Sequence, residues 1–182
     1  MAHRTTFKRS HIQIVKEAVA LAEELVSNFY KMSPTEWLRP KYDVKTAADL
    51  SSNEIIDGPF AQIIRYEGKL KNTSLGSATY DFYKVCLQDH AILAAMENNP
   101  YLKLFAFILY IVTHELIHII RFSKFLQNFD ASPTERMAEE TRVHELTREI
   151  LRPVRVKGLS NVLQFFNEWR PIIDGMHQTD EG

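Results

Sequence analysis

The stretch from Tyr101 to Phe125 constrains the fold of this chain more than any other, because it contains neither glycine nor proline and is apolar on nearly every side. A surface helix carries one apolar stripe, whereas a helix that is apolar all round is buried among other elements. Asn99 and Pro100 precede the stretch, as a cap and a first helical residue would. The sequence therefore predicts a long central helix around which the rest of the chain folds.

Three polar residues interrupt this apolar stretch in the pattern His-Glu-x-x-His: His114, Glu115 and His118. On a helix, residues four apart lie on one face, so both imidazoles can bind one zinc ion at about 2.0–2.1 Å. Glu115 lies about 100° round the helix from His114, where it can reach a water on the metal. Buried His and Glu are costly unless they are paired or bind metal. The pattern thus favours a zinc site with Glu115 as general base over a half-exposed helix face or hydrogen-bonded core histidines.

A catalytic zinc usually has three protein ligands and one open position, so a third ligand should come from another element. The next predicted helix is acidic; it opens with the capping box Ser132-Pro133-Thr134-Glu135 and ends at Pro153. On a helical wheel Glu139 lies nearest the centre of its inward face, Glu140 a little further off, and His144 at the margin. We predict Glu140 as the third ligand and His144 as an oxyanion-stabilising residue or a fourth ligand. Glu139 and a solvated acidic face remain the alternatives.

The rest of the chain contributes two predicted strands and two flanking helices. Residues 12–30 have apolar side chains at three- and four-residue steps, which predicts an amphipathic helix. Phe60–Leu70 and Thr79–Gln88 are rich in Ile, Tyr, Phe and Val and predict two strands joined by a loop, with helix as the alternative. A last short helix follows Gly158, with a loose tail from Asp174. The predicted fold class is α+β, predominantly helical, with a small antiparallel sheet before the central helix.

The length of 182 residues suits a single domain, residues 1–182. We divide it into an N-terminal helical part (1–57), a metal-binding core (58–153) and a C-terminal helix with its tail (154–182). Within the first part, Ser33-Pro34-Thr35-Glu36 has the form of a helix start and predicts a short helix.

Composition and charge exclude several classes of partner. The formal net charge of −1 provides no field that would attract nucleic acid or anionic lipid. The single cysteine, Cys86, cannot form an internal disulfide and is expected to be a buried thiol in a reducing compartment. No apolar signal segment is visible near the N-terminus, and the longest apolar run, Leu104–Val112, is nine residues. We expect a cytoplasmic protein without nucleic-acid or membrane partners; the oligomeric state stays open.

The motif and the helix after it resemble the ImmA/IrrE-type metallopeptidases, members of the wider zincin class. The resemblance joins His114–His118 to Glu140–Pro153 and covers about Tyr80 to Pro153. It implies a gluzincin-like site in which Glu140 takes the place of the ligand glutamate. It also implies a strand before the motif helix whose edge lines the substrate cleft, for which Thr79–Gln88 is the candidate.

These observations predict zinc-dependent hydrolysis of a peptide or amide bond in a peptide or protein substrate. Zn²⁺ lowers the pKa of a bound water to around 7, Glu115 takes the proton, and zinc with His144 stabilises the oxyanion. One alternative is a non-catalytic structural or regulatory zinc site that His144 closes. A di-iron helical bundle is a further one, because Glu115 and His118 have its Glu-x-x-His spacing, although Glu140 and His144 are four apart rather than three.

Overall fold

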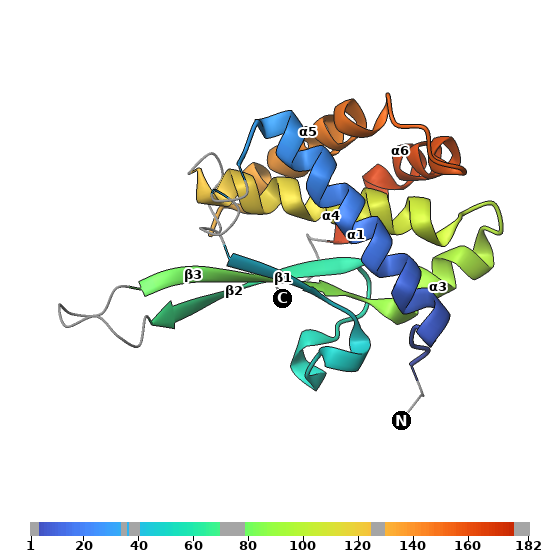
Figure 1. Ribbon diagram of the computed structural model, residues 1–182, viewed down its shortest axis with the longest axis horizontal. Coiled ribbons are helices and arrows are strands. Elements are labelled where there is room, and N and C mark those ends of the chain that lie inside the picture. Colours follow the sequence, from blue (N-terminus) through green and yellow to red (C-terminus); the bar gives the residue numbers. More distant parts are fainter. Residues whose placement is uncertain (1–3, 34–35, 37–40, 70–78, 125–129, 177–182) are drawn as a thin grey trace.

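A computed structural model describes residues 4–33, 36, 41–69, 79–124 and 130–176, with the backbone alone at 41, 67–69, 79–81 and 169–176. The short helix predicted from Ser33 lies largely outside the described residues. In chain order the elements, labelled as in Figure 1, are α1 (Arg9–Tyr30), β1 (Lys41–Lys45), the 3₁₀ turns η1 (Ala47–Asp49) and η2 (Ser52–Glu54), β2 (Ala61–Lys69), β3 (Thr79–Leu87), α3 (Asp89–Asn98), α4 (Leu104–Ser123), α5 (Pro133–Leu151) and α6 (Leu159–Met176).

The α+β class, with helix predominant, is confirmed, but the sheet is mixed rather than antiparallel. Its order is β1-β3-β2: β2 pairs with β3 antiparallel, as the two predicted strands should, while β1 pairs with β3 in parallel. The sequence reading missed β1, which is only five residues long. Because β3 has neighbours on both sides over Phe82–Cys86, the strand expected to line a cleft with its edge is the central strand.

The helices cover one face of this sheet (Figure 1). Alternate side chains of a strand point to opposite faces, and Tyr83, Val85 and Leu87 of β3 are buried in the core, where the Tyr83 ring stacks on Phe122 of α4. The thiol of Cys86 is also buried, as predicted, and burial raises its pKa to about 11.

A buried carboxylate, Glu54 of η2, ties three segments together. It accepts hydrogen bonds from Lys84 Nζ at 2.7 Å, the Tyr66 hydroxyl at 2.9 Å and the Ser51 backbone N–H at 2.9 Å. The contact with Lys84, together with the bonds from Ser51 and Tyr66, lowers the pKa of Glu54 to about 2. The turn after β1 is thereby fixed to strands β2 and β3.

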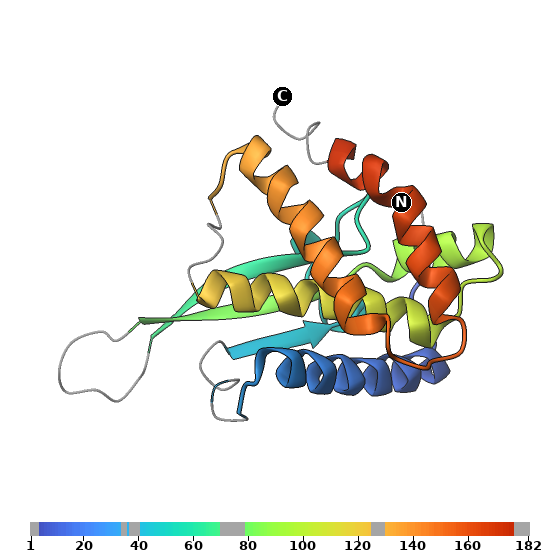
Figure 2. The same cartoon turned by 90° about the horizontal axis from the view of Figure 1, so that it is seen from above.

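Helix α4 is the central helix of the core, as predicted. It is 20 residues long, has a mean hydropathy of 1.6 and could by length alone cross a membrane, but 89% of its apolar window is buried inside the protein. Helix α1 packs against it, and α5 and α6 lie on its other side, as the view from above shows (Figure 2). The hydropathy of α4 therefore fits the core helix of a globular protein.

The predicted start of this helix was wrong by several residues. Asn99 and Pro100 end α3, a helix that the sequence reading missed, and α4 begins only at Leu104. The backbone N–H and the side-chain amide of Asn99 both donate to the Ala95 carbonyl, at 2.9 and 2.8 Å, and so close the last turn of α3. An Asn-Pro pair can close one helix as well as open the next, and here it closes one.

The C-terminal helices follow the predicted order. Helix α5 begins at Pro133 with the expected capping box, in which Ser132 and Glu135 exchange hydrogen bonds, and ends at Leu151. Helix α6 is longer than predicted: it has 18 residues and reaches Met176, so the segment from Asp174 to Met176 is helical. Gly158, at φ 83°, makes the left-handed turn that leads into α6.

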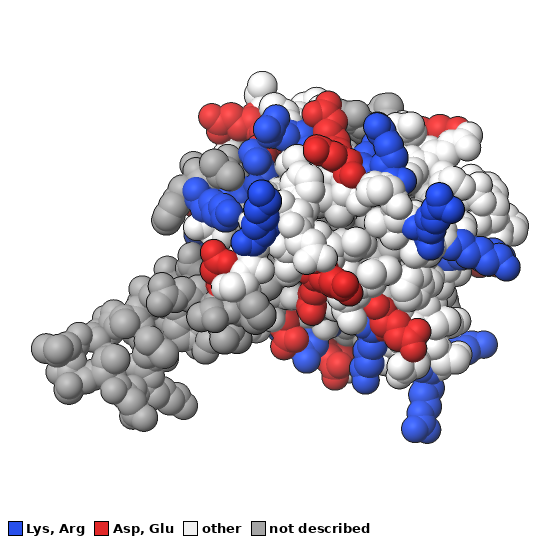
Figure 3. All heavy atoms as spheres, turned by 45° about the horizontal axis from the view of Figure 1, so that its top comes forward, with Lys and Arg blue, Asp and Glu red and all other residues white. Residues whose placement is uncertain are grey.

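Charged side chains of both signs are interspersed on the face of the molecule drawn in Figure 3, and neither sign forms a continuous patch there. This agrees with the formal net charge of −1.

Candidate metal centre

Helix α4 brings its two motif histidines together inside the protein. His114 and His118 are 7% and 5% exposed, and their Nε2 atoms lie 3.2 Å apart. The four-residue spacing places both rings on the same side of the helix, as predicted. The neighbouring turns of α4 are mainly apolar and buried, so the two imidazoles are polar groups in a hydrophobic part of the core.

Glu140 of α5 faces both rings. Its Oε2 lies 3.1 Å from His114 Nε2, and its Oε1 lies 3.0 Å from His118 Nε2. The donor atoms of these three residues all fall within 4.8 Å of one another, and this is the one such group of His, Cys, Asp and Glu found among the described residues. The structure thus brings together the three residues that the sequence reading selected as metal ligands.

The spacing of these donors fits a single metal ion. In a tetrahedral zinc site with bonds of about 2.0–2.1 Å, two ligand atoms are about 3.3 Å apart. The two Nε2 atoms are 3.2 Å apart, and each lies 3.0 or 3.1 Å from a different oxygen of Glu140. The donors are therefore close enough to share one ion after a small adjustment of the side chains.

The electrostatics of Glu140 also fit a cation site. Burial by itself would raise the pKa of this carboxyl group, but His118 and His114 beside it, through charge and hydrogen bonding, bring the pKa well below its usual value. The side chain is 18% exposed. Glu140 therefore stays ionised next to the two rings, in the protonation state that a metal ligand requires.

The neighbouring Glu139 has a different partner. It forms a two-point ion pair with Arg121 of α4, in which Arg121 Nε contacts Oε1 and Nη2 lies 3.2 Å from Oε2. The sequence reading placed Glu139 nearest the centre of the inward face and expected Arg121 to pair with a helix carboxylate. In the structure Arg121 pairs with Glu139, and Glu140 contacts the two histidines. The ion pair also fixes α5 against α4, one turn from the metal group.

His144 lies at the edge of the group. It is 3% exposed, its ring centroid is 4.3 Å from that of His114, and its Nε2 is 3.8 Å from Glu140 Oε2. On its other side, Nδ1 lies 2.7 Å from the Tyr110 hydroxyl. The sequence reading found His144 but missed Tyr110. Its signal was available, since Tyr110 stands one helical turn before His114 and so on the same face of the motif helix.

Glu115 occupies a distinctive place on α4. Between Ala106 and Arg121 it is the one residue that is not buried. A general base must exchange protons with water or substrate while it stays beside the metal. Because Glu115 is partly exposed, it can exchange protons with water.

One feature departs from the usual surroundings of a metal ligand. A ligand histidine normally donates its second ring N–H to an acceptor. His114 Nδ1 is buried and has no hydrogen-bond partner among the residues described. Its ring is instead held by packing, between the Tyr110 ring at 6.4 Å and the His118 ring at 4.8 Å.

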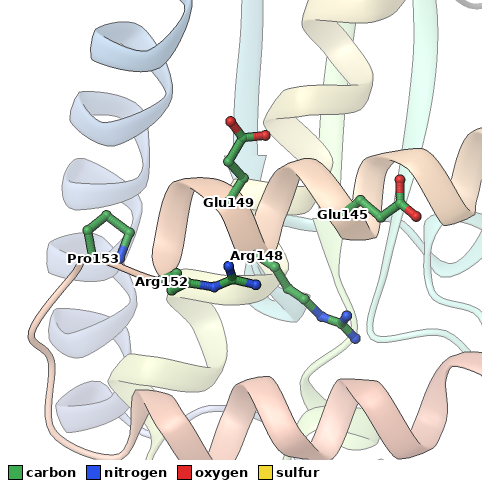
Figure 4. Close-up of a pocket in the computed structure, with 5 residues that line it drawn as sticks. All are labelled: Glu145, Arg148, Glu149, Arg152 and Pro153. Carbon is green, nitrogen blue, oxygen red and sulfur yellow. The ribbon is translucent and has the colours of Figure 1, made fainter.

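A hollow of about 570 Å³ lies further along α5 (Figure 4). Its lining residues are Glu145, Arg148, Glu149, Arg152 and Pro153. None of them belongs to the metal group, and their side chains carry charges of both signs. We therefore place the candidate chemistry at the buried histidines rather than in this hollow.

No family model, no curated protein and no solved structure matches this chain, so the chemistry of the site rests on its own residues.

Proposed function

We propose that this protein is a zinc-dependent hydrolase of peptide or amide bonds. The observation that carries the proposal is the convergence of His114, His118 and Glu140 on one point, with Glu115 on the same helical turn as the histidines. A zinc hydrolase requires this set: two imidazoles and a carboxylate as ligands, and a carboxylate base beside them.

Each residue has a defined part in the proposed reaction. His114, His118 and Glu140 hold the ion. When bound, Zn²⁺ supplies Lewis acidity, polarising a carbonyl and lowering the pKa of water to about 7. Glu115 takes the proton of the attacking water on its carboxylate and delivers it to the leaving amine. His144 provides a further polar group beside the reacting carbonyl oxygen.

The order of elements supports a zincin-like assignment. A helix and a small sheet precede the motif helix, and the ligand glutamate follows on the next helix. This order agrees with the resemblance to ImmA/IrrE-type metallopeptidases, and we propose a peptide or protein as substrate. A cytoplasmic location is proposed with it, on the single buried cysteine.

The test is a comparison of the zinc-loaded wild type with Glu115→Gln on a mixture of fluorogenic peptides. We expect the variant to keep one zinc per chain by elemental analysis and to lose activity by about 10²- to 10⁴-fold, the usual contribution of a general base. Glu145→Gln, which changes an exposed glutamate on α5, is the matched control. Wild-type protein that holds zinc but hydrolyses no better than Glu115→Gln would contradict the proposal.

A second candidate is a structural or regulatory zinc site that His144 closes as fourth ligand. It is favoured by the approach of His144 Nε2 to 3.8 Å from Glu140 Oε2. Such a site would have no open position for substrate. The number of histidines around the ion, measured by X-ray absorption, separates the two: two for the hydrolase and three for the closed site.

A further inference from the structure

Tyr110 and His144 form a buried pair next to the metal group. Tyr110 is 1% exposed, and its ring stacks on Phe166 of α6 at a centroid distance of 3.9 Å and an interplanar angle of 8°. The same ring is 6.0 Å from that of His144, whose Nδ1 is 2.7 Å from the hydroxyl. Packing against Phe166 and His144 holds the Tyr110 ring, and its hydroxyl in turn orients the His144 imidazole.

The two nitrogens of a neutral imidazole have opposite roles, since one donates and the other accepts. His144 Nε2 lies 3.8 Å from a carboxylate oxygen of Glu140, which favours a hydrogen on that nitrogen. Nδ1 is then the acceptor, and the Tyr110 hydroxyl is the donor. A tyrosine hydroxyl can serve in this way because it carries one hydrogen and needs an acceptor when buried.

We propose that Tyr110 is a positioning residue that holds His144 in its Nε2–H form, so that His144 faces the metal group as a hydrogen-bond donor and not as a fourth ligand. The inference rests on the function proposed above and deepens it. An imidazole with hydrogen on Nε2 has no lone pair there for a metal, so His114, His118 and Glu140 would be the protein ligands of a bound ion and a fourth position would stay open. The same N–H is available to an oxygen that becomes negative during hydrolysis.

The decisive measurement is the tautomer of His144 in wild-type protein with zinc bound, read from ¹⁵N chemical shifts of the histidine rings. We expect hydrogen on Nε2, and two histidines around zinc by X-ray absorption. Hydrogen on Nδ1, or three histidine ligands, would overturn the inference. Both measurements need no substrate. A protein with the expected tautomer and no hydrolysis would contradict the proposed function while it upheld the role of Tyr110.

The variant Tyr110→Phe tests the same point by removing the hydroxyl and keeping the ring that stacks on Phe166. We expect the His144 signals to lose the pure Nε2–H pattern and kcat to fall by about 10- to 100-fold, as for other residues that orient a metal site. Tyr42→Phe is the matched control. Tyr42 lies on β1, outside the metal group, and this variant also removes a tyrosine hydroxyl, one that is hydrogen-bonded to Glu23. Unchanged His144 signals in Tyr110→Phe would also overturn the inference.

Discussion

Replacing Glu140 by glutamine should remove most of the stabilisation expected from zinc binding at the proposed centre. The substitution preserves the volume of a side chain that contacts both His114 and His118 through separate oxygens, at 3.1 and 3.0 Å. It removes the only negative charge in the group of three donors. A neutral amide oxygen is a poor zinc ligand, so we expect the affinity to fall by more than the 10- to 100-fold that accompanies loss of an orienting group.

The size of the effect follows from linkage. A ligand at 100 times its Kd stabilises the folded state by about 2.7 kcal/mol. For a chain of 182 residues, each kcal/mol shifts Tm by about 2–4 °C, which gives a zinc-induced rise of about 5–11 °C in the wild type. A 100-fold loss of affinity brings the same zinc concentration to Kd. The stabilisation then falls to about 0.4 kcal/mol and the rise to about 1 °C.

Differential scanning calorimetry in zinc and in EDTA measures both quantities, with each protein compared with its own metal-free form. This removes any change that Glu140→Gln makes to the metal-free protein. Glu145→Gln, an exposed position on the same helix, should keep the full wild-type rise. A zinc-induced rise in Glu140→Gln equal to that of the wild type would show that this carboxylate is not a ligand.

Three further positions, Arg121, Glu54 and Gly158, test contacts that hold the fold together. Arg121→Met leaves the partly buried Glu139 without its partner and should cost about 1–3 kcal/mol in urea unfolding. The double variant Arg121→Met with Glu139→Gln should recover part of this loss, and no loss in the single variant would refute the structural role of the pair. The pKa of Glu54, lowered to about 2, implies stability that is complete above the usual carboxyl pKa and is lost as the pH falls from about 4.5 towards 2. Glu54→Gln should flatten the dependence of unfolding free energy on pH in that window, and an unchanged slope would exclude this carboxylate as its source. Gly158→Ala forces a side chain into φ 83° and into contact with Lys103 Cγ at 2.8 Å, so it should lower stability by about 1 kcal/mol or more; an equal or higher Tm would refute this.

The sequence predicted best the elements whose signal is local. Helix α4 was predicted from the apolar character of successive residues, and the start of α5 from the capping box at Ser132, both of which involve residues within a turn or two of one another. Strand β1 and helix α3 were missed. The five residues of β1 carry little pattern of their own, and its parallel pairing with β3 joins residues about 40 positions apart.

Contacts between distant residues explain what was missed in the site and around it. The wheel correctly turned both Glu139 and Glu140 inward, but it could not tell which of them meets Arg121 and which the histidines. Tyr110 gained its importance only when α5 brought His144 against it. In the same way the buried carboxylate of Asp89 accepts hydrogen bonds from Phe7 N and Ala47 N, at 2.8 and 3.0 Å, residues 82 and 42 positions away.

The Arg121–Glu139 ion pair affects how the metal group tolerates insertions between α4 and α5. The two contacts between Arg121 and Glu139 fix the rotation of α5 about its own axis. The direction in which the next residue, Glu140, points is fixed with it. We therefore expect the number of residues that connect α4 to α5 to have little influence on the position of the Glu140 carboxylate. Insertions in that connection are expected to be tolerated, whereas a single-residue insertion between Arg121 and His118, or between Glu139 and Glu140, would rotate one donor by about 100° and disassemble the triad.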